Sequence, residues 1–246
     1  MYVNEKIIGA VIVILDITEN VKREQLRREF TSNVSHELKT PLTSISGFAE
    51  MMMHGGTPEN TVVDFSATIY NAAQRLIALV SDIMKISELD EGVVLPEREK
   101  VDLYGLSKDI ITRLTPVAEK RNITFNLIGD SAYVMGAEKI LDEMIYNLCD
   151  NAIKYNKENG IVDVIINTTS NKVNLTVRDT GIGIPQADQK RVFERFYRVD
   201  KSHSNQVGGT GLGLAIVKHG AIYHDAQITL ESTEGKGTNV TISFDK

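Results

Sequence analysis

A histidine with reactive polar neighbours stands in the segment Ser35-His36-Glu37-Leu38-Lys39-Thr40-Pro41. The surrounding apolar residues recur every three or four positions, as on the buried face of a helix, and His36 falls on the outward side. Glu37 lies beside it, and Thr40 follows one turn later. An exposed imidazole next to a carboxylate is a plausible nucleophile, because the carboxylate can hold one ring nitrogen while the other stays free. A solvated helix face has the same pattern, so these residues alone leave both interpretations open.

A second set of polar residues follows one side of the helix expected at residues 138–156. Glu143, Asn147, Asn151 and Lys154 recur at steps of four, four and three, beside a stripe of apolar residues. Residues at these spacings share a helix face. A carboxylate, two amides and an ammonium group on one line could contact a metal ion, phosphates and water. An ordinary solvated helix face is the alternative.

Two glycine-containing segments extend this second set. In Asp179-Thr180-Gly181-Ile182-Gly183, Asp179 ends a predicted strand on the face of its apolar residues, so its carboxylate needs a hydrogen-bond donor. The segment 208–214, Gly-Gly-Thr-Gly-Leu-Gly-Leu, opens a predicted helix, whose first N–H groups can hold phosphate. The 25 residues at 184–208 have little regular pattern. Such a segment is typical of a lid or a disordered loop, from which Arg198 could cover a bound anion.

Two long helices are expected to carry the histidine. Apolar residues recur at helical spacing from Leu26 to Met53, and again from Phe65 to Ile86 with alternate steps of four and three. The short connection between these segments predicts an antiparallel helical hairpin with a heptad seam. Apolar residues off the seam, such as Val63 and Ile77, remain uncovered in one hairpin. Pairing of two hairpins into a four-helix bundle would cover them.

The helical pattern breaks near residues 91–98, which predicts a domain boundary. Beyond it, helix-like and strand-like segments alternate, and this pattern predicts an α+β two-layer sandwich with helices on one face of a mixed sheet. At the other end, the β-branched residues 7–17 predict the last strand of a truncated domain. The expected domains are a terminal strand (1–18), a helical hairpin (19–92) and an α+β domain (93–246).

Composition and charge exclude several classes of function. The net charge is −6 and no basic block occurs, which argues against nucleic acid as a partner. The single cysteine, Cys149, excludes an internal disulfide and fits a reducing compartment. The longest apolar run is shorter than the roughly 20 residues of a membrane span, so a membrane is expected to be reached only through segments outside this chain. Thr40 stands where the zinc-protease motif H-E-x-x-H needs its second histidine.

These motifs resemble those of the sensor histidine kinases of bacterial two-component systems, over residues 16–246. The segment His36–Pro41 is similar to the phosphoacceptor motif of their dimerisation domain. The segment 15–19, Leu-Asp-Ile-Thr-Glu, is similar to the end of the PAS sensor domains that precede many such kinases. The remaining motifs follow in the family's order, as the N box at 147–155, the first glycine box at 179–183, the F box at 193–196 and the second glycine box at 209–214.

The resemblance implies an ATP-dependent protein-histidine kinase with an ATP-binding domain of the GHKL (Bergerat) type. The γ-phosphoryl group of ATP would pass to His36, with Glu37 as base or orienting partner, and then to an aspartate in the receiver domain of a response regulator. Thr40 matches the position that orients water when such kinases dephosphorylate the regulator. The resemblance also implies a homodimer through residues 19–92 and a cytoplasmic location, as the cytoplasmic portion of a sensor.

The resemblance also assigns roles in the second domain. Asp179 would accept a hydrogen bond from the adenine amine, and Asn147 with Glu143 would hold Mg²⁺. Two alternatives stay open, a catalytically silent signalling scaffold and another GHKL ATPase. The other residues expected to bind the nucleotide are Asn151, Lys154, Tyr155, Gly181, Gly183, Arg198, Gly209, Thr210, Gly211, Leu212 and Gly213.

One segment departs from the family pattern. His224-Asp225-Ala226 stands where many relatives have His-Gly-Gly. Because aspartate tolerates the left-handed backbone conformation, a local adjustment without loss of function is expected.

Overall fold

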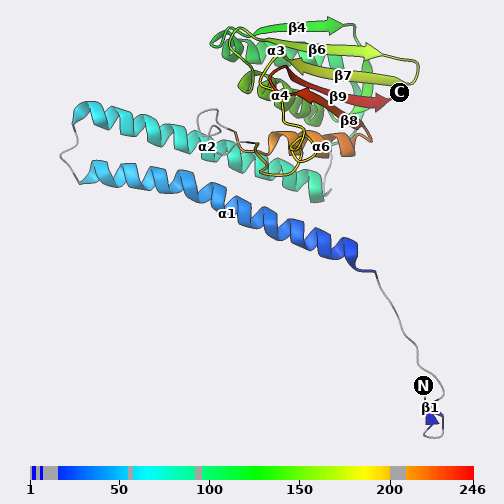
Figure 1. Cartoon of the computed structure of the whole chain (residues 1–246), viewed down its shortest axis with the longest axis horizontal. Helices are drawn as coiled ribbons and strands as arrows, with labels where there is room; N and C mark the ends of the chain where they lie inside the picture. The colour runs from blue at the N-terminus through cyan, green and yellow to red at the C-terminus, as the bar shows by residue number, and fades with distance from the viewer. Residues whose placement is uncertain (1, 4–5, 8–15, 55–57, 92–95, 200–208) are drawn as a thin grey trace.

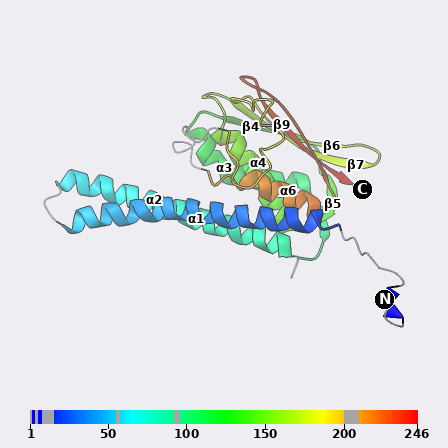
Figure 2. The same cartoon turned by 60° about the horizontal axis from the view of Figure 1, so that its bottom comes forward.

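The computed structural model describes residues 2–3, 6–7, 16–54, 58–91, 96–199 and 209–246. Two long helices, α1 (Thr18–Met53) and α2 (Glu59–Glu91), form an antiparallel hairpin (Figures 1 and 2). Phe48 of α1 and Phe65 of α2 pack between them, with ring centroids 4.9 Å apart. None of the helices within the described ranges is both long and apolar enough to cross a membrane. The predicted helical hairpin is confirmed.

Little of the N-terminal segment can be compared with the prediction. The strand β1 (Tyr2–Val3) pairs antiparallel with β2 (Lys6–Ile7). Of the strand predicted at residues 7–17, residues 8–15 lie outside the described residues, and residues 16–17 are not in a strand. The PAS-like assignment of this segment therefore stays a prediction.

The second half of the chain is built on a five-stranded mixed sheet. One pair of neighbouring strands, at one edge of the sheet, is parallel, and the other three pairs are antiparallel. Three helices, α3 (Leu103–Glu119), α4 (Glu138–Lys154) and α6 (Gly213–Tyr223), cover one face (Figures 1 and 2). The predicted α+β sandwich is confirmed. In spatial order the strands are β4 (Thr124–Gly129), β6 (Ile161–Thr168), β7 (Lys172–Asp179), β9 (Gly237–Asp245) and β8 (Gln227–Thr233).

A separate two-stranded sheet is formed by one strand before α3 and one after it. The strand β3 (Glu99–Asp102) pairs antiparallel with β5 (Tyr133–Gly136). The carboxylate of Asp102 accepts the backbone N–H of Tyr104 at 3.1 Å, so it satisfies one of the unpaired donors at the start of α3.

The core between the sheet and the helices fixes where the polar residues point. Val173, Leu175 and Val177 alternate along β7 and are buried against the helices. Each such side chain contributes about 1.5–3 kcal/mol to folding when it is fully buried. The apolar stripe of α4 is buried in the same core. The polar stripe of α4 and the carboxyl end of β7 are therefore held by packed elements.

The helix α6 packs on two sides. One side contacts α4 in the second domain, and the other contacts α2 of the hairpin. Figure 1 shows α6 lying between the sheet domain and the hairpin. The buried residues of this second contact are Leu79 and Ile86 of α2, with Leu212, Ala215 and Ile216 at α6.

Candidate functional site

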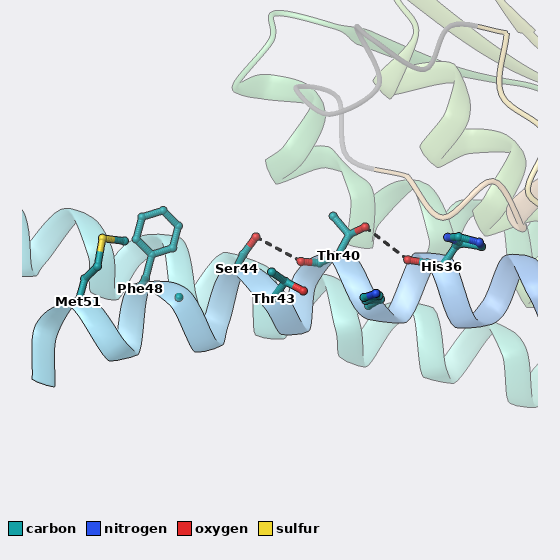
Figure 3. A pocket seen from close by; sticks show the side chains of 8 residues that line it. His36, Thr40, Thr43, Ser44, Phe48 and Met51 are labelled. Atoms are coloured by element: carbon teal, nitrogen blue, oxygen red, sulfur yellow. Dashed lines mark hydrogen bonds between the residues drawn. The ribbon is translucent and has the colours of Figure 1, made fainter.

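His36 is exposed on α1, as its spacing predicts. The hydroxyl of Thr40 donates to the backbone carbonyl of His36 at 3.3 Å, and both side chains point to the same side of the helix (Figure 3). An open groove of about 490 Å³ begins at His36 and runs along α1 to Met51. The imidazole is therefore accessible to a second molecule. The other residues that line the groove are Lys39, Thr43, Ser44, Gly47 and Phe48.

Glu37, the residue after His36, pairs with a charged group of α2. Its carboxylate lies 3.4 Å from the guanidinium of Arg75 on α2. Arg198 of the second domain is half-buried, and desolvation lowers its pKa, while Tyr155, Arg75 and Glu37 act on it electrostatically. Glu37 and Arg75 are therefore close enough to the second domain to influence Arg198 electrostatically. Sequence reasoning missed Arg75, which looks like any polar residue of a long helix.

The polar stripe of α4 lies on one side of the helix, but two of its charges are already paired. Glu143 Oε1 lies 2.8 Å from the ammonium of Lys85 on α2, with side chains 29% and 35% exposed. Lys154 pairs with Asp150 one turn before it, at 2.6 Å. Neither Lys85 nor Asp150 was among the predicted residues.

The two amides of this stripe, Asn147 and Asn151, are partly covered by the surrounding structure. Asn147 is half-buried, and its Nδ2 donates to the backbone carbonyl of Glu143 at 2.8 Å, which fixes the orientation of the amide. Asn151 is also half-buried. The stripe therefore presents a carboxylate and amide oxygens at partly covered positions.

The hydrogen-bond donors that Asp179 requires come from the backbone. Its Oδ1 accepts the N–H of Gly181 at 2.8 Å and that of Thr238 at 3.2 Å. Burial raises the pKa of Asp179, and these two hydrogen bonds oppose the shift. Gly181 is required here, because a Cβ would lie 2.3 Å from the carbonyl oxygen of Tyr155. The loop and the end of α4 are in direct contact at this point.

The second glycine box lies against the N box. A Cβ on Gly213 would lie 2.7 Å from Asn147 Oδ1, so glycine allows the start of α6 to approach that amide. Gly211 has φ +71°, a left-handed conformation that favours glycine. A Cβ on Gly209 would lie 3.7 Å from the hydroxyl of Tyr155. Asn147 and Tyr155 therefore lie at the second glycine box, beside the N-terminus of α6, a place suited to an anion.

Thr210 ties this glycine box to the hairpin. Its hydroxyl donates to Asp82 of α2 at 2.7 Å and accepts the N–H of Leu212 at 3.2 Å. Burial raises the pKa of Asp82, and the hydrogen bond from Thr210 opposes the shift. Asp82 is a further residue that the sequence did not indicate.

The F box also reaches the hairpin. The ring of Phe196 lies 5.7 Å from that of Phe30 on α1, measured between centroids. The guanidinium of Arg195 lies 5.1 Å from the centre of the same Phe30 ring. The described part of the segment predicted as a lid, residues 184–199, contains no helix or strand.

The donor set suits a metal that takes few protein ligands. Within the described ranges, no three His, Cys, Asp or Glu side chains gather to hold an ion by themselves. Mg²⁺ typically uses one or two carboxylates together with substrate phosphates and water. Glu143 and Asn147, beside the phosphate-suited start of α6, fit that pattern.

Two family models match the chain. Residues 26–92 match the His Kinase A (phospho-acceptor) domain. Residues 136–246 match the histidine kinase-, DNA gyrase B-, and HSP90-like ATPase.

Curated relatives extend the likeness over nearly the whole chain. The sensor histidine kinase WalK of Bacillus subtilis is 37% identical over 244 residues, which are 97% of this chain and 40% of that protein. The sensor-like histidine kinase SenX3 of Mycolicibacterium smegmatis is 37% identical over 236 residues, which are 96% of this chain and 62% of that protein. The chain therefore spans about half the length of these relatives.

Solved structures share the fold. Histidine kinase ThkA, in complex with the response regulator protein TrrA, has a TM-score of 0.72 at 23% identity, covering 94% of this chain and 65% of that chain. Full-length ShkA in complex with AMPPNP has a TM-score of 0.64 at 24% identity, covering 90% of this chain and 45% of that chain.

Proposed function

Because this chain belongs to the sensor histidine kinases of two-component systems, we propose that it phosphorylates His36 from ATP and passes the phosphoryl group to an aspartate of a response regulator. The observation that carries the proposal is the docking of the ATPase domain on the helix that bears the exposed His36, where the ring of Phe196 lies 5.7 Å from that of Phe30 of α1. This docking brings the domain that would bind the nucleotide to the helix of the proposed phosphoacceptor.

Nucleotide binding follows from the second set of residues. Two backbone N–H groups hold one oxygen of Asp179, which leaves the carboxylate oriented to accept the adenine amine. The N–H groups at the start of α6 would receive the phosphates. The AMPPNP complex of ShkA supports a nucleotide in this fold. The remaining residues that would line the nucleotide are Asn151, Lys154, Tyr155, Gly181, Gly183, Arg198, Gly209, Thr210, Gly211, Leu212 and Gly213.

Asn147 and Glu143 would hold Mg²⁺ beside the phosphates. The ion would neutralise charge on the triphosphate, which is a large part of what phosphoryl transfer requires. Glu143 is paired with Lys85 in this structure, so it must exchange that ammonium for the metal.

At the acceptor, an imidazole nitrogen of His36 would attack the γ-phosphorus while the bond to ADP breaks. The proton of the ring passes to Glu37, whose carboxylate Arg75 holds at 3.4 Å. Lys154 and Arg198 add positive charge near the transferred group. These side chains position the reactants and neutralise charge, which is the main task of a protein in this reaction.

The groove on α1 is the proposed contact for the receiver domain of the regulator, because it begins at His36 and is open. The complex of ThkA with TrrA supports a regulator as partner of this fold. We also propose a phosphatase activity toward that regulator. In it, the Thr40 hydroxyl would leave the His36 carbonyl and orient water.

A homodimer through residues 19–92 is proposed from an exposed stripe on α2. Val63, Tyr70, Ile77 and Met84 recur every seven residues and are 65%, 64%, 62% and 58% exposed. A heptad repeat of exposed apolar side chains is the surface that a second helix pair covers.

The place of the chain in a longer protein is proposed from the relatives. We propose that it is the cytoplasmic kinase part of a sensor, divided at residues 1–18, 19–92 and 93–246, with no nucleic acid as partner. The relatives' additional length supports further segments, which would include the sensor and any membrane anchor.

The test is transfer of label from γ-labelled ATP with Mg²⁺. The parent should acquire acid-labile, base-stable phosphate, and His36→Gln should lose it. His54→Gln is a matched control, because His54 is exposed just after the last residue of α1 and is near a carboxylate, Glu50, at 3.7 Å. Equal labelling of His36→Gln and the parent would refute the proposal, and an unlabelled parent would favour a silent scaffold.

A further inference from the structure

We infer that each chain phosphorylates its own His36, so that transfer occurs in cis within the dimer. The inference rests on the proposed kinase function and on the proposed dimer. It depends on which copy of α1 the ATPase domain faces.

In a four-helix bundle of two hairpins, α2 has two α1 neighbours, one from its own chain and one from the partner. Contact with α2 alone would therefore not decide the direction of transfer. The cluster of α6 with Leu79 and Ile86 is such a contact. The decision depends on contacts with α1.

The ATPase domain makes those contacts with α1 of its own chain. Phe196 and Arg195 both lie on the ring of Phe30, at 5.7 and 5.1 Å from its centre. Leu38 of α1 packs against the same buried cluster as Phe30. Phe30 precedes His36 by six residues, or about 9 Å along the axis, and Leu38 follows it by about 3 Å. The domain therefore contacts its own α1 at Phe30, less than two helical turns before the histidine.

Polar contacts lie on the same side. Glu37 and Arg75, both of the hairpin, act electrostatically on Arg198 of the ATPase domain. Thr210 donates to Asp82 of the same chain at 2.7 Å. These interactions add to the docking of the ATPase domain on its own hairpin.

The connection between the domains restricts any larger swing. The hydroxyl of Tyr223 donates to the carbonyl of Pro96 at 2.6 Å, and Arg98 pairs with Asp225 at 3.0 Å. These contacts attach the second part of the connection to the ATPase domain. Only five residue steps separate Pro96 from Glu91, the last residue of α2. Five steps span at most about 17 Å, even when fully extended.

The experiment uses two heterodimers with the same two substitutions, made by co-expression with different tags and purified through both tags. In the first, one chain carries His36→Gln and the other carries Asp179→Asn. In the second, one chain carries both substitutions and the other is the parent. The readout is phosphate from labelled ATP on each chain, separated by mass, with the parent homodimer alongside.

Transfer in cis predicts no label in the first heterodimer and, in the second, label on the parental chain at about half the amount per parent dimer. Transfer in trans predicts the opposite result for both. Label in the first heterodimer, or none in the second, overturns the inference. An unlabelled parent homodimer would overturn the proposed function itself, so the two failures are distinguishable. A folding defect from either substitution is present in both preparations and cannot produce the opposed results.

Discussion

Replacing Lys85 by methionine tests whether the hairpin competes with a metal ion for Glu143. The Lys85 ammonium lies 2.8 Å from Glu143 Oε1, and the two side chains are 35% and 29% exposed. Methionine removes the charge but keeps an unbranched apolar stem and a good helix former, so packing of α2 should change little. The carboxylate would then be available as a metal ligand without first losing a partner.

The expected size follows from the exposure of the pair. A partly exposed ion pair contributes about 0.2–1 kcal/mol after solvent screening. That range corresponds to about a 1.4- to 5-fold change in an equilibrium constant. The Mg²⁺ concentration that half-saturates autophosphorylation should therefore fall by this factor in Lys85→Met, and it should stay near the parental value in Lys85→Arg.

The assay is a titration of Mg²⁺ at saturating ATP, with calorimetric binding of Mg²⁺ and AMPPNP as a readout independent of catalysis. Lys139→Met is the matched control, since Lys139 is an exposed lysine of α4. If Lys85→Met left both titrations unchanged, or weakened metal binding, the competition for Glu143 would be wrong.

Two further predictions concern the dimer and the pH dependence of stability. Ile77→Asp places a charge on the exposed apolar stripe of α2 and should give a monomeric mass by light scattering. Val117→Asp makes the same kind of change at an exposed residue of α3, outside the hairpin, and should leave the mass unchanged. Burial lowers the pKa of His224, so the unfolded chain binds a proton at this residue more readily than the folded chain does. The melting temperature, measured by circular dichroism, should therefore be highest above a pH of about 6.5 and fall as the pH decreases below that value. A dimer of Ile77→Asp, or a melting temperature that rises on acidification, would contradict them.

The elements that rest on local periodicity could be predicted from the sequence. The heptad seam gave α1 and α2, and strict alternation gave β7. The strand β3 was missed, because Glu99-Lys100-Val101-Asp102 is mostly charged and belongs to a small sheet at the edge of the domain. Its strand character comes from pairing with β5, more than 30 residues away in sequence. Such pairing leaves no periodic signal in the segment itself.

The same distinction applies to the site. The predicted residues carry their own signal, because amide, carboxylate and glycine occur at spacings set by one helix or one turn. Arg75, Asp82 and Lys85 have no such signal, since on α2 they look like ordinary polar positions. The contacts of Asp82 and Lys85 come from the approach of the ATPase domain to the hairpin, and the contact of Arg75 comes from the pairing of α2 with α1. Sequence reasoning therefore predicted the candidate site residues but not the contacts that the hairpin makes with them.

Asp225, which departs from the family pattern, combines a left-handed backbone conformation with an ion pair. It has φ +55°, the left-handed conformation that the sequence predicted aspartate would tolerate where relatives have glycine. A glycine could supply this backbone but not the carboxylate that pairs with Arg98 at 3.0 Å. Aspartate at this position therefore adopts a backbone conformation that glycine would adopt more readily, but its carboxylate attaches the interdomain connection to the end of α6.

The contacts of α2 with Glu143 and Thr210 would couple docking to the proposed nucleotide binding. Both residues are proposed to serve the bound metal and phosphates, yet both are engaged by the hairpin in this structure. If contact with α2 and contact with the ligand exclude each other, docking lowers the affinity for Mg²⁺ and ATP by some factor. Binding of Mg²⁺ and ATP must then lower the affinity of docking by the same factor. Loading with nucleotide then releases the polar contacts with α2, while the apolar contacts of Phe196 and α6 keep the domain on its own hairpin. A signal that shifts α2 along the hairpin would act on this balance without touching the nucleotide.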